Sequence, residues 1–197
     1  MKKYLFILAA LALLIFTTSC GSNSIDVADA KKMKAFGEKV LKKLESGAIV
    51  SYIEFGKNQN QELRLTTQFA DITIRYRDSE KKSKILTYSI AKGKFEVKDS
   101  RTPFINGSGR EIVAQDFIKM SDNINKAIQE QKSNSIEIIG IGLYKVNLSK
   151  DPKTEIYTFR LYEEDKSKKK ELWATYYIEY SCSMDGDGNI KSLRLGW

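Results

Sequence analysis

The chain contains no histidine, only two cysteines and only two prolines among its 197 residues. The absence of histidine removes the usual general base at neutral pH, and with it the Ser-His and Cys-His nucleophile pairs. It also removes the commonest zinc ligand. With 42% hydrophobic and 29% charged residues, the composition is that of a globular protein. We therefore expect a folded protein that is not an enzyme and that uses no cofactor or metal.

The N-terminus carries a targeting signal. Lys2 and Lys3 form a short positive region, and residues 4–16 are an uninterrupted apolar run of thirteen. A membrane-spanning helix needs about 20 such residues, whereas the apolar core of a signal peptide needs about 7–15. Residues 1–19 are therefore predicted to be a signal peptide.

A small residue and a cysteine end this signal, in the run Thr-Thr-Ser-Cys-Gly at 17–21. This run resembles the processing site of bacterial lipoproteins. The resemblance implies that the chain is cleaved after Ser19 and that lipidated Cys20 anchors it to a membrane of the cell envelope. Gly21, rather than Asp, after the cysteine favours the outer membrane under the sorting rule of that family. A soluble secreted product is the alternative, because Thr17 stands where the family usually has leucine.

Cleavage changes the charge and the cysteine count only slightly. It removes 19 of the 197 residues and two lysines, so the mature chain has 178 residues and a net charge of +6 instead of +8. Cys182 is then the only cysteine besides the lipidated one, so the even cysteine count is no evidence for an intramolecular disulfide, and an intermolecular one stays open. Residues 20–25 are expected to form a polar, lipidated tether.

Two segments have the periodicity of one-sided helices. Residues 26–46 place their apolar side chains on one stripe, and residues 109–132 do so at alternating steps of four and three. Ser108 and Glu111 are predicted to form a capping box at the start of the second helix. Both helices must cover an apolar surface elsewhere in the chain.

Most of the remaining chain alternates between apolar and polar residues, as β-strands do. The predicted strands are 49–55, 63–76, 85–90, 95–97, 136–148, 156–162, 172–184 and 190–195. Tight polar turns separate them, which is typical of antiparallel meanders. In the second run the apolar phase slips between Phe69 and Ala70, which predicts a bulge or a bend there.

The two halves of the mature chain share one order of elements. At a shift of 87 residues, Met33 aligns with Met120 and Ile49 aligns with Ile136. Each half reads as helix, strand, strand, lysine-rich turn, strand, glycine turn and strand, which predicts a tandem duplication. The predicted organisation is a first α-β4 unit at 26–98, a linker at 99–108 and a second α-β4 unit at 109–197.

This α+β organisation, with one helix packed on an antiparallel four-stranded meander in each unit, resembles the PepSY-like and β-lactamase-inhibitor-protein-like group of exported proteins. The resemblance covers most of residues 26–197 and concerns architecture alone, so it assigns no functional residue. A cystatin-like or NTF2-like fold, with a single curved sheet wrapped on a helix, is the alternative.

The strand predicted at 172–184 has two different faces. One face includes Cys182, which we expect to be a buried core thiol. The other face comprises Trp173, Thr175, Tyr177 and Glu179. Exposed aromatic side chains on a rigid sheet suit a protein or sugar partner, because aromatics dominate binding hot spots. The alternative is that another part of the protein covers this face.

Two polar features favour structural roles over chemistry. Residues 185–189 (Asp-Gly-Asp-Gly-Asn) match the first ligands of an EF-hand, but Ile190 and Gly196 stand where that loop needs Gly and Glu. We therefore predict a hairpin turn there and no metal site. Lysines cluster at two predicted hairpin tips, 81–84 and 166–170. Such patches can hold anionic lipid or polysaccharide, with solvated turns as the alternative.

These features predict a non-catalytic cell-envelope lipoprotein that binds a protein or peptide partner. A binder of glycan or anionic envelope polymer, using Trp173 and Tyr177, is the alternative. A third hypothesis, a hydrolase that uses two carboxylates alone, needs two facing acids at roughly 5–10 Å. Nucleic acid is not an expected partner, because no recognition motif is present.

Overall fold

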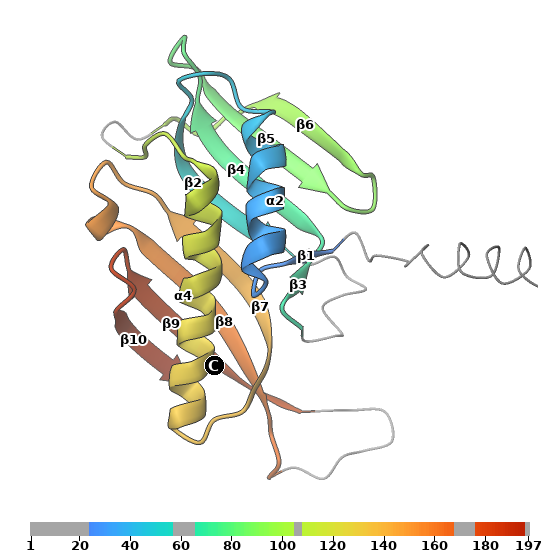
Figure 1. The fold of residues 1–197 in the computed structure, drawn as a ribbon, viewed down its shortest axis with the longest axis vertical. Helices are drawn as coiled ribbons and strands as arrows, with labels where there is room; N and C mark the ends of the chain where they lie inside the picture. Colours follow the sequence, from blue (N-terminus) through green and yellow to red (C-terminus); the bar gives the residue numbers. More distant parts are fainter. Residues whose placement is uncertain (1–23, 57–65, 105–107, 168–175, 196–197) are drawn as a thin grey trace, which may run out of the picture.

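The computed structural model of the protein describes residues 24–56, 66–104, 108–167 and 176–195. Helices α2 (Ala30–Leu41) and α4 (Ala114–Ser133) lie side by side on one face of a large antiparallel sheet (Figure 1). Neither of these described helices is long and apolar enough to span a membrane. The predicted signal peptide and Cys20 lie outside the described residues.

Ten strands accompany the helices. They are β1 (Ile25–Asp26), β2 (Ile49–Gly56), β3 (Gln68–Phe69), β4 (Asp71–Arg77), β5 (Ser83–Ser89), β6 (Lys94–Asp99), β7 (Ile138–Asn147), β8 (Ile156–Glu164), β9 (Tyr177–Asp185) and β10 (Ile190–Leu195). Eight of them form one sheet in the order β10-β9-β8-β7-β2-β4-β5-β6, and β1 pairs with β3 separately. A 3-10 turn, η1 (Pro152–Thr154), precedes β8. The predicted α+β class and antiparallel pairing are confirmed.

The order of strands follows the chain on each side of the sheet centre. After α2, the strands β2, β4, β5 and β6 are successive neighbours, and after α4 so are β7, β8, β9 and β10. The two sets meet where β2 pairs with β7, over four register pairs from Tyr52↔Asn147 to Phe55↔Tyr144. All eight strands therefore belong to one continuous sheet.

Helix α2 is shorter than the predicted segment 26–46. Asp29 is its N-cap, and its carboxylate accepts the backbone N–H groups of Lys31 and Lys32 at 3.0 and 3.1 Å. The preceding residues cannot join the helix because β1 holds them extended, with Ile25 paired to Phe69. Periodicity alone does not reveal this pairing, since it joins residues more than 40 positions apart.

Helix α4 begins at Ala114, later than the predicted start at residue 109. The capping box predicted for Ser108 and Glu111 is therefore wrong. Gly109 has a φ of +80°, and a Cβ there would lie 2.5 Å from the carbonyl oxygen of Val50. The next residue, Arg110, exchanges two backbone hydrogen bonds with Val50, so the chain stays extended here. The N-cap residue is instead Val113, whose N–H donates to the carboxylate of Asp116, in the first turn of the helix, at 2.7 Å.

The predicted irregularity between Phe69 and Ala70 is confirmed as a change of sheet. Phe69 ends β3, and β4 begins at Asp71. Ala70 lies between them, and its N–H donates to the carbonyl of Gly56 at 3.0 Å. Because the apolar phase slips at this point, Phe69 of β3 and the inward-facing side chains of β4 are all buried in the same core.

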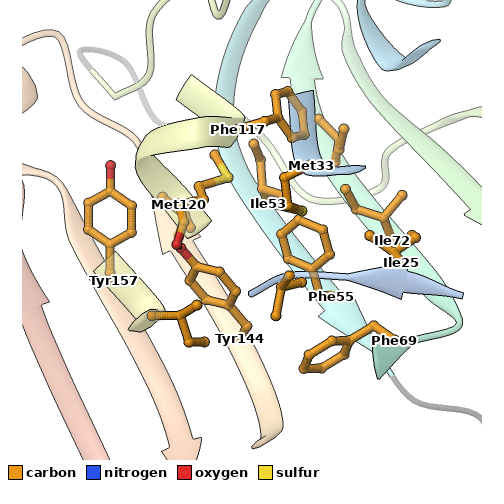
Figure 2. Packing of buried hydrophobic residues seen from close by; sticks show 14 of the residues in the cluster. Ile25, Met33, Ile53, Phe55, Phe69, Ile72, Phe117, Met120, Tyr144 and Tyr157 are labelled. Carbon is orange, nitrogen blue, oxygen red and sulfur yellow. The ribbon is translucent and has the colours of Figure 1, made fainter. Parts of the chain in front are cut away.

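The core fills the space between the helix pair and the inner face of the sheet. Figure 2 shows Met33 of α2 and Met120 of α4 reaching toward Phe55 and Tyr144 of the sheet. The Tyr144 hydroxyl donates to the carbonyl of Met120 at 2.8 Å, so this buried polar group is satisfied. All four side chains are fully buried.

The two helices approach closely because one residue lacks a side chain. A Cβ at Gly37 of α2 would lie 2.4 Å from the ring of Phe117 on α4. Phe117 is fully buried and cannot move aside. Gly37 therefore sets the spacing of the helix layer that backs the sheet.

A buried ion network ties α4 to the sheet. The Glu155 carboxylate is fully buried and accepts from Arg110 Nε at 2.7 Å and from the Tyr157 hydroxyl at 3.0 Å, while Lys119 Nζ lies 3.6 Å away. Arg110 also forks onto Asp116 at 2.7 and 2.9 Å. The hydrogen bonds to Asp116 and Glu155 raise the pKa of Arg110 above its ordinary value. The network joins the segment before α4, the helix itself and the start of β8.

Removal of Glu155 should be costly because the partly buried Arg110 loses one of its two acid partners and the buried Tyr157 hydroxyl loses its acceptor. We expect Glu155→Ala to lower the free energy of unfolding by about 2–4 kcal/mol, measured by urea denaturation. Glu137→Ala is the matched control, since its ion pair with Lys166, at 3.2 Å, joins side chains that are 73% and 71% exposed. That control should cost less than about 1 kcal/mol. Equal losses in the two variants would contradict a stabilising role for the network.

Candidate functional site

Both helices lie on one side of the large sheet (Figure 1). The side chains of β2 and β4–β10 that point away from the helices form a second surface, which we name the open face. Burial along β9 illustrates the division. Cys182 and Met184 are fully buried on the helix side, whereas the alternate residues Ser181 and Ser183 are exposed or partly exposed. The open face is therefore a surface built on the rigid backbone of the sheet.

A row of polar side chains crosses the entire open face. Its members are directly opposite one another in the register of all eight strands: Glu96, Thr87, Thr73, Glu54, Lys145, Thr158, Ser183 and Ser192. We name these eight residues the polar row. Hydroxyl groups both donate and accept hydrogen bonds, and five of the eight members are Ser or Thr. The row thus offers hydrogen bonding along a single line across the sheet.

Charged and aromatic groups gather at the centre of the open face, where β2 meets β7 and β4. The Glu54 carboxylate accepts a hydrogen bond from the Tyr52 hydroxyl and lies 3.3 Å from Lys145 Nζ. The Arg75 guanidinium lies 5.2 Å from the centroid of the Tyr52 ring. Burial and the bond to Glu54 raise the pKa of Tyr52, so the phenol stays protonated at neutral pH.

The binding residues predicted on 172–184 are only partly visible. Trp173 and Thr175 lie outside the described residues. Tyr177 and Glu179 are both on the open face, where Tyr177 is 42% exposed. Glu179 accepts a hydrogen bond from the Tyr162 hydroxyl at 2.7 Å, and burial with this bond raises the pKa of Tyr162 to about 12. Tyr177 is therefore accessible to a partner, whereas Glu179 is engaged within the sheet.

Cys182 is a free, fully buried thiol, as the strand pattern predicts. Burial is the main cause that raises its pKa to about 11, with a smaller contribution from the charge of Glu130. The thiol is therefore protonated at neutral pH and poorly suited to nucleophilic chemistry.

The lysine-rich turns are partly neutralised by neighbouring acids. Lys82 pairs with Glu80 at 2.6 Å, and Lys84 pairs with Asp99 at 2.7 Å. Lys166 pairs with an exposed glutamate. Lysines 168–170 lie outside the described residues. The first cluster thus carries less net charge than the sequence alone implies.

The segment at 185–189 is a hairpin turn between β9 and β10, as predicted. The Asp185 carboxylate accepts the N–H groups of Asp187 and Asn189 at 3.1 and 2.8 Å, and Lys191 Nζ lies 2.8 Å away. The bond to Lys191 is the main cause that lowers the pKa of Asp185. Throughout the described ranges, no three Cys, Asp or Glu side chains gather closely enough to hold a metal ion.

Gly186 in this turn is required by the packing of its neighbour. A Cβ at Gly186 would lie 1.6 Å from the carbonyl oxygen of Pro152, a backbone atom in η1. We expect Gly186→Ala to lower the free energy of unfolding by about 1–3 kcal/mol, measured by thermal or urea unfolding. Gly56→Ala is the control, since its Cβ would meet nothing closer than Asp71 Cβ at 4.0 Å. A neutral Gly186→Ala variant would show that the turn does not rest on η1.

The sequence reasoning missed the polar row and the central cluster. No local signal marks them, because their members come from eight strands and only the register brings them together.

Comparison of the chain with protein-family models, with curated proteins and with solved structures gives no match. The functional inference therefore rests on the geometry of the open face and on the N-terminal sequence.

Proposed function

We propose that this protein is a non-catalytic, lipid-anchored module of the bacterial cell envelope that binds a protein partner on its open face. The polar row is the observation that carries this proposal, because it spans all eight strands while both helices occupy the opposite side. A hydrogen-bonding surface of this extent suits a macromolecular partner better than a small substrate.

The dimensions of the open face match those of a protein interface. Eight strands spaced by about 4.8 Å give a width of about 33 Å, and strands of six residues are about 20 Å long. The resulting area of about 650 Å² is close to the ~800 Å² that each partner contributes to a standard interface. Tyr52 and the exposed Tyr177 supply the aromatic contacts that dominate such interfaces.

The topology supports an origin by tandem duplication. Each helix is followed by four strands that are successive neighbours, and the first strands of the two sets, β2 and β7, pair with each other. We infer that residues 26–98 and 109–197 are related α-β4 units joined by the linker 99–108. Two fused units present one continuous open face, as the architectural resemblance to β-lactamase-inhibitor-protein-like proteins also suggests.

The partner surface can be located with a photo-crosslinking amino acid placed at single sites in the full chain. Thr73 and Thr158, on the polar row, should each crosslink to the same envelope protein in intact cells. Glu38, exposed on α2, is the matched control and should give at least tenfold less of that product. Mass spectrometry of the crosslinked bands identifies the partner class. Equal crosslinking from Glu38, or products with lipid or glycan alone, would contradict a protein partner on the open face.

The anchor can be tested independently of the partner. Cys20→Ser should move the protein from the membrane fraction to the soluble fraction, because the variant lacks the thiol that receives the lipid. Thr17→Leu is the control and should remain with the membrane. Cell fractionation followed by immunoblotting measures both variants. Continued membrane sedimentation of Cys20→Ser would overturn the lipoprotein assignment.

A further inference from the structure

A pocket of about 440 Å³ lies beside Tyr52 and Arg75, where β2 begins and β7 ends. Its walls come from β2, β4 and β5, from residues 147 and 148 at the end of β7, from residues 100 and 102–104, which follow β6, and from Ser108. The volume falls within the range of about 300–1,000 Å³ that is typical of small-molecule sites. The pocket is therefore large enough for a ligand the size of a monosaccharide derivative.

The charge of this pocket has one sign. Among the described residues, two cationic side chains line it, Arg75 and Lys84, and no Asp or Glu does. Lys84 is already paired with Asp99, at 2.7 Å. Arg75 has no carboxylate partner within the described residues, and its guanidinium faces the Tyr52 ring. Arg75 is therefore the cation available to a ligand in the pocket.

A second arginine reinforces the positive charge next to this wall. Arg77, two residues along β4, lies with its guanidinium 5.2 Å from the centroid of the Phe104 ring, and Phe104 lines the pocket. A ring stacked against a guanidinium occupies its flat face and leaves the N–H edge for hydrogen bonding. That edge matches the two oxygens of a carboxylate or phosphate. Both arginines are thus held in a form suited to an oxyanion.

The remaining polar lining suits hydroxyl groups. Five of the lining residues are serine or threonine: Ser51, Ser83, Ser100, Thr102 and Ser108. Asn147 adds an amide, which both donates and accepts. Hydroxyls and amides pair well with the alternating donors and acceptors of a sugar ring.

We propose that this pocket binds a small anionic saccharide, a sugar acid or a sugar phosphate. The oxyanion is held by Arg75, the sugar hydroxyls meet the Ser and Thr side chains with Asn147, and Phe104 lies against the ring. This inference goes beyond the proposed protein partner and does not depend on it, because no residue of the polar row lines the pocket; Tyr52 alone belongs both to the pocket wall and to the proposed interface.

Isothermal titration calorimetry on the full chain in mild detergent, at low ionic strength, tests this site. The probes are glucuronate and glucose 6-phosphate, with glucose as the neutral control. We expect at least one anion to bind at least tenfold more tightly than glucose. Preference for glucuronate would identify a carboxylate ligand, and preference for glucose 6-phosphate a phosphate ligand. Absence of binding by both anions, or equal binding of glucose, would overturn the proposal.

Three variants assign the binding to the pocket. Arg75→Gln should weaken the affinity for the bound anion at least tenfold, and Arg75→Lys about threefold to tenfold, because lysine keeps the charge but loses the forked donors. Arg194→Gln removes a cation from β10 on the same face and should change the affinity less than twofold. An equal loss in Arg194→Gln would show general charge attraction and overturn the site. If Arg75→Gln lowers the thermal unfolding midpoint, the affinity of the Arg75→Lys variant alone tests whether the guanidinium of Arg75 binds the anion.

Discussion

The pairing of β2 with β7 is the contact on which the rest of this structure depends. It joins the four strands that follow α2 to the four that follow α4, through the register pairs from Tyr52↔Asn147 to Phe55↔Tyr144. On the helix side this pairing stacks the rings of Phe55 and Tyr144 at 5.4 Å. On the other side it brings Glu54 to 3.3 Å from Lys145. Without it the polar row would divide into two separate groups of four residues.

The helix layer holds this sheet from behind. Gly37 lets α2 approach α4 until Phe117 lies against the backbone, and the network around Glu155 fixes the start of α4 to β8. Close packing makes such a layer resist deformation. The open face is therefore presented on a backbone braced by both helices, which would reduce the entropy lost on binding of the proposed partner.

Hydrogen-bonding and charged groups dominate the centre of the open face. This centre combines hydroxyl groups, the ion pair of Glu54 with Lys145, and Arg75 stacked on Tyr52. The thiol of Cys182 is buried and protonated on the opposite, helix-covered side of the sheet. Polar surfaces of this kind remain soluble when free and still form many hydrogen bonds in a complex. The protein partner proposed above lies along the polar row and the anionic saccharide lies beside Arg75, and Tyr52 borders both.

The sequence by itself determined the class of the two helices and of the strands in the large sheet. Alternation in the eight strands of the sheet and the apolar stripes of α2 and α4 are local patterns, and the slip at Phe69 located the change from β3 to β4. The tertiary structure alone decided the helix starts, the buried network around Glu155, the polar row and the pocket beside Arg75. Each of these depends on strand register or on contacts between residues distant in the chain, for which local periodicity carries no information.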